Sequence, residues 1–234
     1  MTKLLVAIAA YNEMENIPAL LDAVLAAVPD AEILVVDDDS PDGTGRYVRE
    51  RSAQDPRIRC MIRHGKRGLG SAVLDAFRHA AAHDYDFVIN MDADFSHPPE
   101  KIPELLRAMN EPVDAAIGSR YVTGGKILGW PAHRKIMSRL INLWAGLCLG
   151  LKTRDNSGAF RCYRVETLRR VLEGPFRSQG YSFFEEILYR LKKNGAVLTE
   201  IPITFTDRTR GRSKINKKEA VQAVWNIFVI GWRG

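Results

Sequence analysis

The sequence has few of the features that mark cysteine-rich or membrane-spanning proteins. Its 234 residues include three cysteines, Cys60, Cys148 and Cys162, which lie far apart and lack the close pairs of a zinc site. Cys148 and Cys162 stand among apolar residues, so we expect buried thiols, and this cysteine usage fits a reducing compartment. No uninterrupted apolar run reaches the roughly 20 residues that a membrane-spanning helix needs.

A signal peptide and a nucleic-acid-binding pattern are missing as well. The apolar stretch Leu4–Ala9 passes directly into Tyr11-Asn12-Glu13 and a helical pattern, so it is interpreted as a buried first strand. Although 34 Lys and Arg against 28 Asp and Glu give a formal net charge of +6, no basic stretch is interleaved with aromatic residues as in RNA-binding sequences. The charge therefore favours a lipid or small-molecule phosphate over nucleic acid as the partner, and part of it serves only to keep the surface soluble.

Short apolar runs alternate with helical patterns over the first two thirds of the chain. This alternation is typical of βαβ units and predicts an α/β fold, with a mostly parallel sheet flanked by helices. We see no repeat and no linker, and predict one domain over residues 1–234. The predicted strands are Leu4–Ala9, Glu32–Val36, Ile58–Ile62, Asp86–Met91, Val113–Gly118 and Gly158–Tyr163, with Val197–Phe205 extended; later predicted helices are Pro98–Asn110, Phe183–Lys193 and an amphipathic segment at about 217–233.

Charged loops follow three of the predicted strands, at 37–42, at 92–94 and at Arg120. Ligands of parallel sheets bind beyond the carboxyl ends of the strands, so we expect these loops to form one site. Asp92 and Asp94 can both face a ligand where the chain turns, and Mg²⁺ and Mn²⁺ prefer oxygen ligands, commonly one or two carboxylates completed by phosphate and water. The alternative is that both aspartates only cap the following helix.

The other polar loops each have two interpretations. The four carboxylates in 37–42 can accept hydrogen bonds from a base and a ribose, or can build a turn together with Ser, Pro and Gly. The basic segment 63–70 suits an anion, but it lacks the ending of a Walker sequence and fits a solvated loop equally. The dense run Arg208–Lys214 predicts either a loop that closes over phosphates or a solvated charge run.

Together these motifs resemble those of polyprenol-phosphate mannose synthases, which are inverting family 2 glycosyltransferases with a GT-A fold. Each motif is weak alone, but their order is specific and spans nearly the whole chain. The matching segments are Ala10-Tyr11-Asn12-Glu13, 36–44, 66–70, 91–97, Ser119-Arg120-Tyr121 and 207–214.

The resemblance implies transfer of mannose from GDP-mannose to a polyprenyl (dolichyl) phosphate, with Mg²⁺ or Mn²⁺ as cofactor. An ionised lipid phosphate can attack the sugar without a strong general base, and the sequence shows no Ser-His-Asp arrangement. Catalysis then rests on positioning and charge stabilisation. The implied nucleotide-sugar residues are Ala9, Tyr11, Glu13, Val36, Asp38, Asp92, Ala93, Asp94, Arg120 and Glu186; the metal ligands are Asp92 and Asp94; the acceptor-phosphate residues are Arg134, Ser138, Arg208 and Lys214; the catalytic residues are Asp94, Arg120, Arg208 and Lys214.

Three positions depart from the family pattern. Ala9 stands where a proline is usual, and Phe184 replaces a glutamine that is common in relatives. Ser96 stands where some relatives have a metal-binding glutamine and others a serine. We therefore expect a water in place of direct metal coordination by Ser96.

Two segments are amphipathic at helical spacing, one starting at Arg134 and the other at about 217–233. Such helices lie in lipid interfaces, which predicts peripheral attachment to the cytoplasmic face of a membrane. The alternative is a core helix with a polar outer face. In the first segment the apolar face carries Ile136, Leu140, Leu143, Trp144 and Leu147, and the polar face carries Arg134, Ser138 and Asn142.

Other functions stay open at this point. A related enzyme could transfer glucose or another sugar from a UDP-sugar to the same lipid. A metal-dependent nucleotidyltransferase should carry a glycine-rich, basic loop directly after the first strand, where this chain has Tyr11-Asn12-Glu13. A non-catalytic nucleotide-sugar-binding module is the third alternative, and the intact Asp92 and Asp94 pair argues against it.

Overall fold

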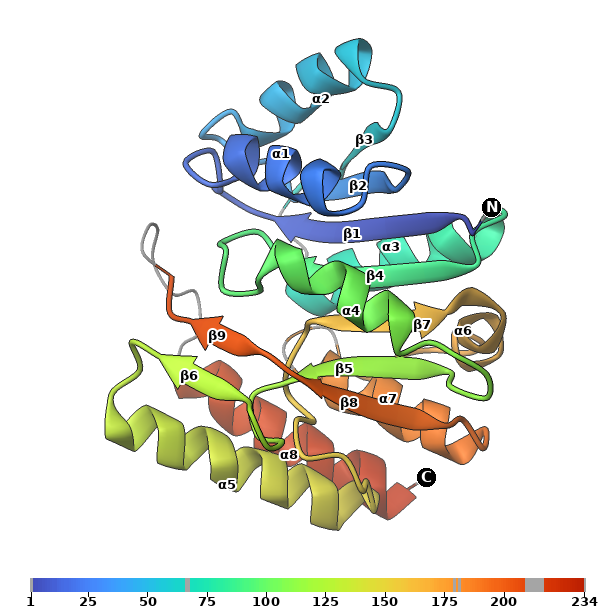
Figure 1. Ribbon diagram of the computed structural model, residues 1–234. Helices are drawn as coiled ribbons and strands as arrows, with labels where there is room; N and C mark the ends of the chain where they lie inside the picture. The colour runs from blue at the N-terminus through green and yellow to red at the C-terminus, as the bar shows by residue number, and fades with distance from the viewer. Residues whose placement is uncertain (1, 66–67, 179, 181, 209–216, 234) are drawn as a thin grey trace.

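The computed structural model describes residues 2–65, 68–178, 180, 182–208 and 217–233. Its centre is a seven-stranded sheet with the order β3-β2-β1-β4-β7-β5-β8 and with helices on both faces (Figure 1). The pairs β1–β2, β1–β4, β2–β3 and β5–β8 are parallel, whereas β7 is antiparallel to both of its neighbours. The predicted α/β fold with a mostly parallel sheet is confirmed.

The bounds of the elements are as follows. The sheet contains β1 (Leu4–Ala10), β2 (Glu32–Asp37), β3 (Ile58–Ile62), β4 (Phe87–Asp92), β5 (Ala115–Ser119), β7 (Arg161–Arg164) and β8 (Leu198–Pro202), and a second sheet pairs β6 (Lys126–Leu128) with β9 (Thr204–Thr206). The helices are α1 (Ile17–Ala27), α2 (Thr44–Gln54), α3 (Leu69–Ala82), the 3-10 turn η1 (Pro99–Lys101), α4 (Ile102–Arg107), α5 (Ala132–Leu149), α6 (Val165–Val171), α7 (Phe183–Lys193) and α8 (Lys217–Arg233).

Three sequence predictions need correction. The helix expected over Pro98–Asn110 is a 3-10 turn followed by the six-residue α4, because prolines at the start of each remove backbone donors. The extended segment 197–205 is split between two sheets at Ile203, whose N–H donates to the Ser119 carbonyl while its own carbonyl accepts from Lys126 N–H. Cys162 is buried as expected, but Cys148 is only half-buried.

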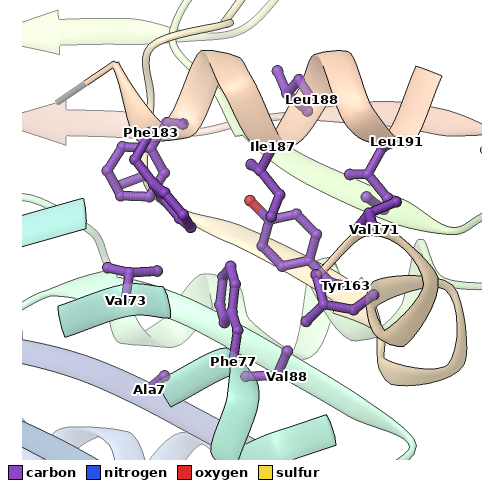
Figure 2. Packing of buried hydrophobic residues seen from close by; sticks show 14 of the residues in the cluster. Ala7, Val73, Phe77, Val88, Tyr163, Val171, Phe183, Ile187, Leu188 and Leu191 are labelled. Carbon is purple, nitrogen blue, oxygen red and sulfur yellow. The ribbon is translucent and has the colours of Figure 1, made fainter. Parts of the chain in front are cut away.

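The core has one layer on each face of the sheet. Helices α1, α2 and α4 pack on one face, and α3, α6 and α7 pack on the other. Phe77 of α3 lies at the centre of the second layer, with its ring centroid 5.1 Å from Tyr163 and 6.1 Å from Phe183 (Figure 2). This layer joins α7 to the sheet.

The strand register brings the predicted loops to one edge. Ala9 of β1 lies opposite Val36 of β2 and opposite Asp92 of β4, and Ala10 lies opposite Asp37. Since these strands run in the same direction, the loops that leave them start from a common edge.

Helices α5 and α8 lie side by side along one border of the molecule (Figure 1). Their approach is close at Gly231, where an added Cβ atom would clash with the carbonyl oxygen of Cys148. Within the described residues no helix combines the length and the apolar character needed to cross a bilayer.

Replacing Phe77 by Ala should destabilise the fold by about 3–5 kcal/mol, because the fully buried ring leaves a cavity between three elements. Chemical denaturation followed by circular dichroism measures this. Val197→Ala is the control, since Val197 is 42% exposed and its truncation should cost little. A loss below about 1 kcal/mol for Phe77→Ala would contradict the central packing of this ring.

Candidate active site

The loops after β1 and β2 are joined by backbone-to-side-chain hydrogen bonds. Asn12 N–H donates to Ser40 Oγ (2.9 Å), Glu13 N–H to Thr44 Oγ1 (3.0 Å) and Met14 N–H to a carboxylate oxygen of Asp42 (3.0 Å). The turn chemistry expected for 37–44 is therefore present, and it shapes the pocket to which Tyr11 and Glu13 are assigned. Glu13 is buried, and its carboxylate accepts a hydrogen bond from the Asn16 amide.

Asp38, which is assigned to the base and ribose, already has partners. Its carboxylate forms a buried ion pair with Arg63 and accepts Gly68 N–H at 3.1 Å. Arg63 also donates to Ser71 Oγ and to the carboxylate of Asp75, both at 3.0 Å. The ion pair therefore ties the loop after β2 to the start of α3, and Asp38 acts first as an organiser of this pocket.

The predicted metal ligands stand at the end of β4. Asp94 is buried and accepts Ser96 N–H at 3.1 Å, and Phe95 between them has a positive φ of 59°. His97 Nδ1 accepts Asp92 N–H at 3.0 Å, so its proton is on Nε2, which lies 3.8 Å from a carboxylate oxygen of Asp92. Burial lowers the pKa of His97, and the ring is therefore neutral. The turn thus directs both carboxylates to the same edge of the sheet.

The charges at this turn suit a divalent cation. Burial raises the pKa of Asp92, and the neighbouring charge of Asp94 raises it further, so that the opposing charges of Arg208 and Arg120 do not restore the ordinary value. Burial also raises the pKa of Asp94, but the hydrogen bonds from Ser96 and the charge of Arg208 outweigh it and lower the pKa overall. No cluster of three or more His, Cys, Asp or Glu side chains suited to a metal occurs among the described residues. Two carboxylates completed by phosphate and water fit Mg²⁺ or Mn²⁺.

Arg120 follows β5 and forms a buried ion pair with Asp155. Its Nε and Nη2 donate to the two oxygens of Asp155 at 2.7 and 2.6 Å, and its backbone N–H donates to the same carboxylate at 2.9 Å. Arg120 is 9% exposed and Asp155 is fully buried. Among the described residues no hydrogen bond is seen at the remaining nitrogen, Nη1, and the guanidinium lies 5.3–5.6 Å from the ring centroids of Tyr121, Trp130 and Phe205.

The segment after β9 connects the carboxylate pair with α5. Arg208 forms an ion pair with Asp94 (3.1 Å), while its neighbour Asp207 forms one with Arg134 on α5 (3.1 Å). Arg120 and Arg134 both lie over the ring of Trp130, at 5.6 and 4.1 Å from its centroid. Predicted donor-side and acceptor-side cations are therefore brought together.

Helix α5 turns its polar face inward. Asn142 is buried, Arg134 and Ser138 are half-buried, and Ser138 Oγ accepts a hydrogen bond from the Tyr121 hydroxyl at 2.7 Å. The apolar face is exposed, with Leu140 at 59% and Leu147 at 72%. The alternative of a core helix with a polar outer face is therefore wrong, because the polar residues face the protein whereas most of the large apolar residues are exposed.

Glu186, which is assigned to the sugar pocket, is buried in a structural contact. Its carboxylate accepts N–H of Arg177 and Ser178 and pairs with Arg190 at 3.0 Å. Its neighbour Glu185 is also buried, and burial raises the pKa of Glu185 to about 7. The sugar-pocket role of Glu186 stays a prediction.

No individual role was predicted for four residues at this edge. Arg63 and His97 lie within the segments 63–70 and 91–97, which the sequence did single out, whereas Trp130 and Asp155 were not among the predicted site residues. The partner of Asp155 is Arg120, 35 residues away in sequence. For Asp155 the only local signal is the turn-forming run Asp155-Asn156-Ser157-Gly158. Lys214 and the basic loop around it lie outside the described residues.

Comparison with known proteins gives a consistent result. The model of Glycosyl transferase family 2 matches residues 5–172. An undecaprenyl-phosphate mannosyltransferase of Micrococcus luteus is 40% identical over 236 residues, which cover 99% of this chain and 97% of that protein. A polyprenol monophosphomannose synthase of Mycolicibacterium smegmatis is 40% identical over 231 residues, which cover 98% of this chain and 87% of that protein.

Solved structures agree at the level of the fold. Glucosyl-3-phosphoglycerate synthase from Mycobacterium tuberculosis, in complex with Mn²⁺, uridine diphosphate and glucosyl-3-phosphoglycerate, has a TM-score of 0.66 and 17% identity, covering 98% of this chain and 78% of that chain. The same enzyme with phosphoglyceric acid has a TM-score of 0.68. The predicted GT-A fold is confirmed.

The buried Glu185 should make stability depend on pH. The folded-state pKa of about 7 lies above the ordinary 4.5, so the stability contributed by the protonated form is present in full below pH 4.5 and is lost as the pH rises through 7. This loss amounts to about 3 kcal/mol. The Gln side chain of Glu185→Gln does not titrate. The melting temperature of this variant, relative to that of the unsubstituted protein, should therefore be several degrees higher at pH 8 than at pH 5, at about 2–4 °C per kcal/mol.

Thermal unfolding by differential scanning fluorimetry at both pH values measures this difference. The matched control is Glu166→Gln, at an exposed position on α6, which should follow the unsubstituted protein at both pH values. A constant difference between Glu185→Gln and the unsubstituted protein would show that Glu185 is ionised at pH 5 and would contradict the prediction.

Proposed function

The chain belongs to glycosyl transferase family 2 and is therefore a glycosyltransferase, and we propose that it moves mannose from GDP-mannose to a polyprenyl (dolichyl) phosphate to give polyprenyl phosphate mannose. Two relatives, each 40% identical over nearly the whole chain, bear the names of polyprenyl phosphate mannosyltransferases. Their names do not include the donor, so the choice of GDP-mannose rests on the motif resemblance.

One observation carries the proposal. A line of charged contacts leads from Asp94 through Arg208 and Asp207 to Arg134 on α5, a helix whose outer face is apolar and exposed. A water-soluble acceptor would gain nothing from an exposed apolar helix beside the phosphate-binding cations. A phosphate carried on a lipid needs cations that bind the headgroup and, next to them, an apolar surface that contacts the lipid.

The site supports a simple displacement. An ionised acceptor-phosphate oxygen attacks the anomeric carbon of mannose, the bond from that carbon to the oxygen of the GDP β-phosphate breaks, and the configuration is inverted. A divalent cation held by Asp92 and Asp94 would neutralise the diphosphate that leaves. Arg120 and Arg208 add fixed positive charge on the same side. Arg134 and Ser138 orient the acceptor phosphate.

The same geometry supports peripheral attachment to an anionic lipid surface. The exposed apolar residues come from both α5 and α8, and the cation Arg139 on α5 is exposed as well. This surface carries Ile136, Met137, Leu140, Leu143 and Leu147 on α5, each at least 55% exposed, and Trp225 and Trp232 on α8, at 60% and 79%. We place the attachment on the cytoplasmic face of the membrane.

The activity is tested with radiolabelled GDP-mannose, UDP-glucose and UDP-galactose, a polyprenyl phosphate in detergent, and either Mg²⁺ or Mn²⁺. We expect an organic-soluble labelled product from GDP-mannose. Product from a UDP-sugar alone would replace the donor in the proposal, and no product from any donor would reject the proposal.

Asp94→Asn should lower transfer by about 100-fold or more, because the carboxylate that holds both the cation and Arg208 is lost. Isothermal titration of GDP in the presence of Mn²⁺ should show weaker binding as well. Asp84→Asn is the matched control, since Asp84 is exposed beyond the opposite end of β4 and should leave both measurements unchanged. Full activity of Asp94→Asn would remove Asp94 from the site.

Attachment is tested by co-sedimentation with liposomes that contain anionic lipid. Leu147→Glu should lower the partition coefficient by at least about tenfold, because a leucine contact worth about 1.5–3 kcal/mol is replaced by a like charge. Ala53→Glu adds the same charge at an exposed position on α2, which packs against β3 at the opposite edge of the sheet, and serves as the control. Equal partition of the two variants would rule out α5 as the lipid-facing surface.

A further inference from the structure

Asn142 is a buried polar residue on a helix that is otherwise largely exposed. It is 4% exposed, and α5 buries only two further residues, Ala145 and Leu149. Its amide oxygen accepts N–H of Asn156 (2.6 Å) and of Ser157 (3.0 Å). Its amide nitrogen donates to Ser157 Oγ (3.0 Å) and to the Ser138 carbonyl (2.8 Å). Every hydrogen-bonding position of this side chain is therefore used, and three of the four bonds go to the loop 153–158.

The same loop holds Arg120. Asp155 accepts three hydrogen bonds from Arg120, and Ser157 Oγ accepts a fourth, from Arg120 Nη2 at 3.0 Å. Ser157 Oγ is therefore the shared partner of Arg120 and Asn142. Its hydroxyl connects the guanidinium at the end of β5 directly with the amide on α5.

A second connection closes a ring. Tyr121, which follows Arg120 in the chain, donates its hydroxyl hydrogen to Ser138 Oγ at 2.7 Å. Ser138 lies one helical turn before Asn142 on α5, and its carbonyl accepts from the Asn142 amide. The ring thus passes from Arg120 through Ser157, Asn142, Ser138 and Tyr121 back to Arg120. Two bridges fix both the position of α5 along its axis and its rotation relative to the end of β5.

We propose that Asn142 is a positioning residue that sets the separation between the donor-side cation Arg120 and the acceptor-side residues of α5, through the loop 153–158. This inference rests on the proposed function, which places the nucleotide diphosphate at Arg120 and the lipid phosphate at Ser138 and Arg134. A lipid-bound helix is subject to forces from the membrane. The Asn142 bridge holds α5 to the loop 153–158, so that such forces do not change the distance between the nucleotide diphosphate and the lipid phosphate.

The chemistry of an amide suits this role. A single amide side chain both donates and accepts, so it can bind two backbone N–H groups and one hydroxyl without introducing charge. A buried apolar residue would leave the N–H groups of Asn156 and Ser157 without a partner, which is unfavourable in the interior. A helix held only by apolar contacts could slide or rotate, whereas directional hydrogen bonds select one register.

The test compares Asn142→Ala with the unsubstituted protein in the mannosyl transfer assay. The dissociation constant of GDP in the presence of Mn²⁺, measured by titration, should stay within twofold of the unsubstituted value. The same titration gives the number of active sites. The kcat per active site should fall by about 10- to 100-fold, as expected when reacting groups are misplaced by about an ångström. Thr167→Val is the matched control: it removes a buried hydrogen bond to Asp114 on the opposite side of the fold, and it should lower the melting temperature but keep kcat.

Ser157 provides a smaller change. Ser157→Ala removes the hydroxyl that joins Arg120 to Asn142 and should lower kcat in the same direction, whereas Ser157→Thr keeps a hydroxyl and should restore most of it. A purely structural role of Asn142 would lower the melting temperature without changing kcat per active site. With a purely structural role, Ser157→Ala and Ser157→Thr would also have the same kcat. An unchanged kcat per active site in Asn142→Ala, or equal kcat values of the two Ser157 variants, would overturn the proposal.

Hydrogen–deuterium exchange tests the positioning itself without transfer. In Asn142→Ala the backbone amides of peptides covering 119–123 should exchange faster than in the unsubstituted protein, together with those covering 153–158, while peptides of β1 and β2 stay unchanged. If the unsubstituted protein transfers no sugar but this exchange pattern is seen, the proposed function fails and the positioning stands. Unchanged exchange at 119–123 overturns the positioning whatever the transfer assay gives.

Discussion

The buried ion pair between Arg120 and Asp155 is the interaction on which the organisation of the candidate site depends. Two charges withdrawn from water are tolerated only when each is paired and hydrogen-bonded, and here the carboxylate receives three N–H groups from one arginine. Burial raises the pKa of Asp155, but the Arg120 charge outweighs it and holds the pKa below its ordinary value, so both partners stay ionised. The loop that carries Asp155 must therefore remain where Arg120 is.

That loop is in turn fixed from two further sides. Glu200 on β8 accepts the backbone N–H groups of Arg154 and Asp155 at 2.8 and 3.0 Å, and Asn142 binds the next two residues from α5. One short segment thus joins the end of β5, the edge strand β8 and the helix that we propose to face the lipid. The geometry of the candidate site and the position of α5 therefore depend on the same short segment.

The sequence was informative where the signal is local and periodic. Apolar runs predicted the strands of the parallel sheet, and polar residues at their ends predicted the common edge at which Asp37, Asp92 and Arg120 now lie. Pairing across long stretches of chain left no such signal. The antiparallel β7, the exchange of sheets at Ile203 and the partners of Asp38, Arg120 and Arg134 all depend on contacts between distant segments. The polar face of α5 was identified from its spacing, but its direction was not, because periodicity shows that a helix has two faces and not which one the protein covers.

The close contact of Gly231 with the Cys148 carbonyl has a geometric consequence for the border formed by α5 and α8. Two helices in ordinary contact, with axes about 8–10 Å apart, leave a furrow between their side-chain ridges. At Gly231 no side chain separates the two backbones, and Trp144 bridges them by donating its indole N–H to the Val224 carbonyl at 3.4 Å and stacking on Phe228. The Trp144 and Phe228 rings therefore occupy part of the furrow between α5 and α8. Any other residue at position 231 would bring a carbon atom against the Cys148 carbonyl and push the two helices apart, and the aromatic side chains that join them would separate.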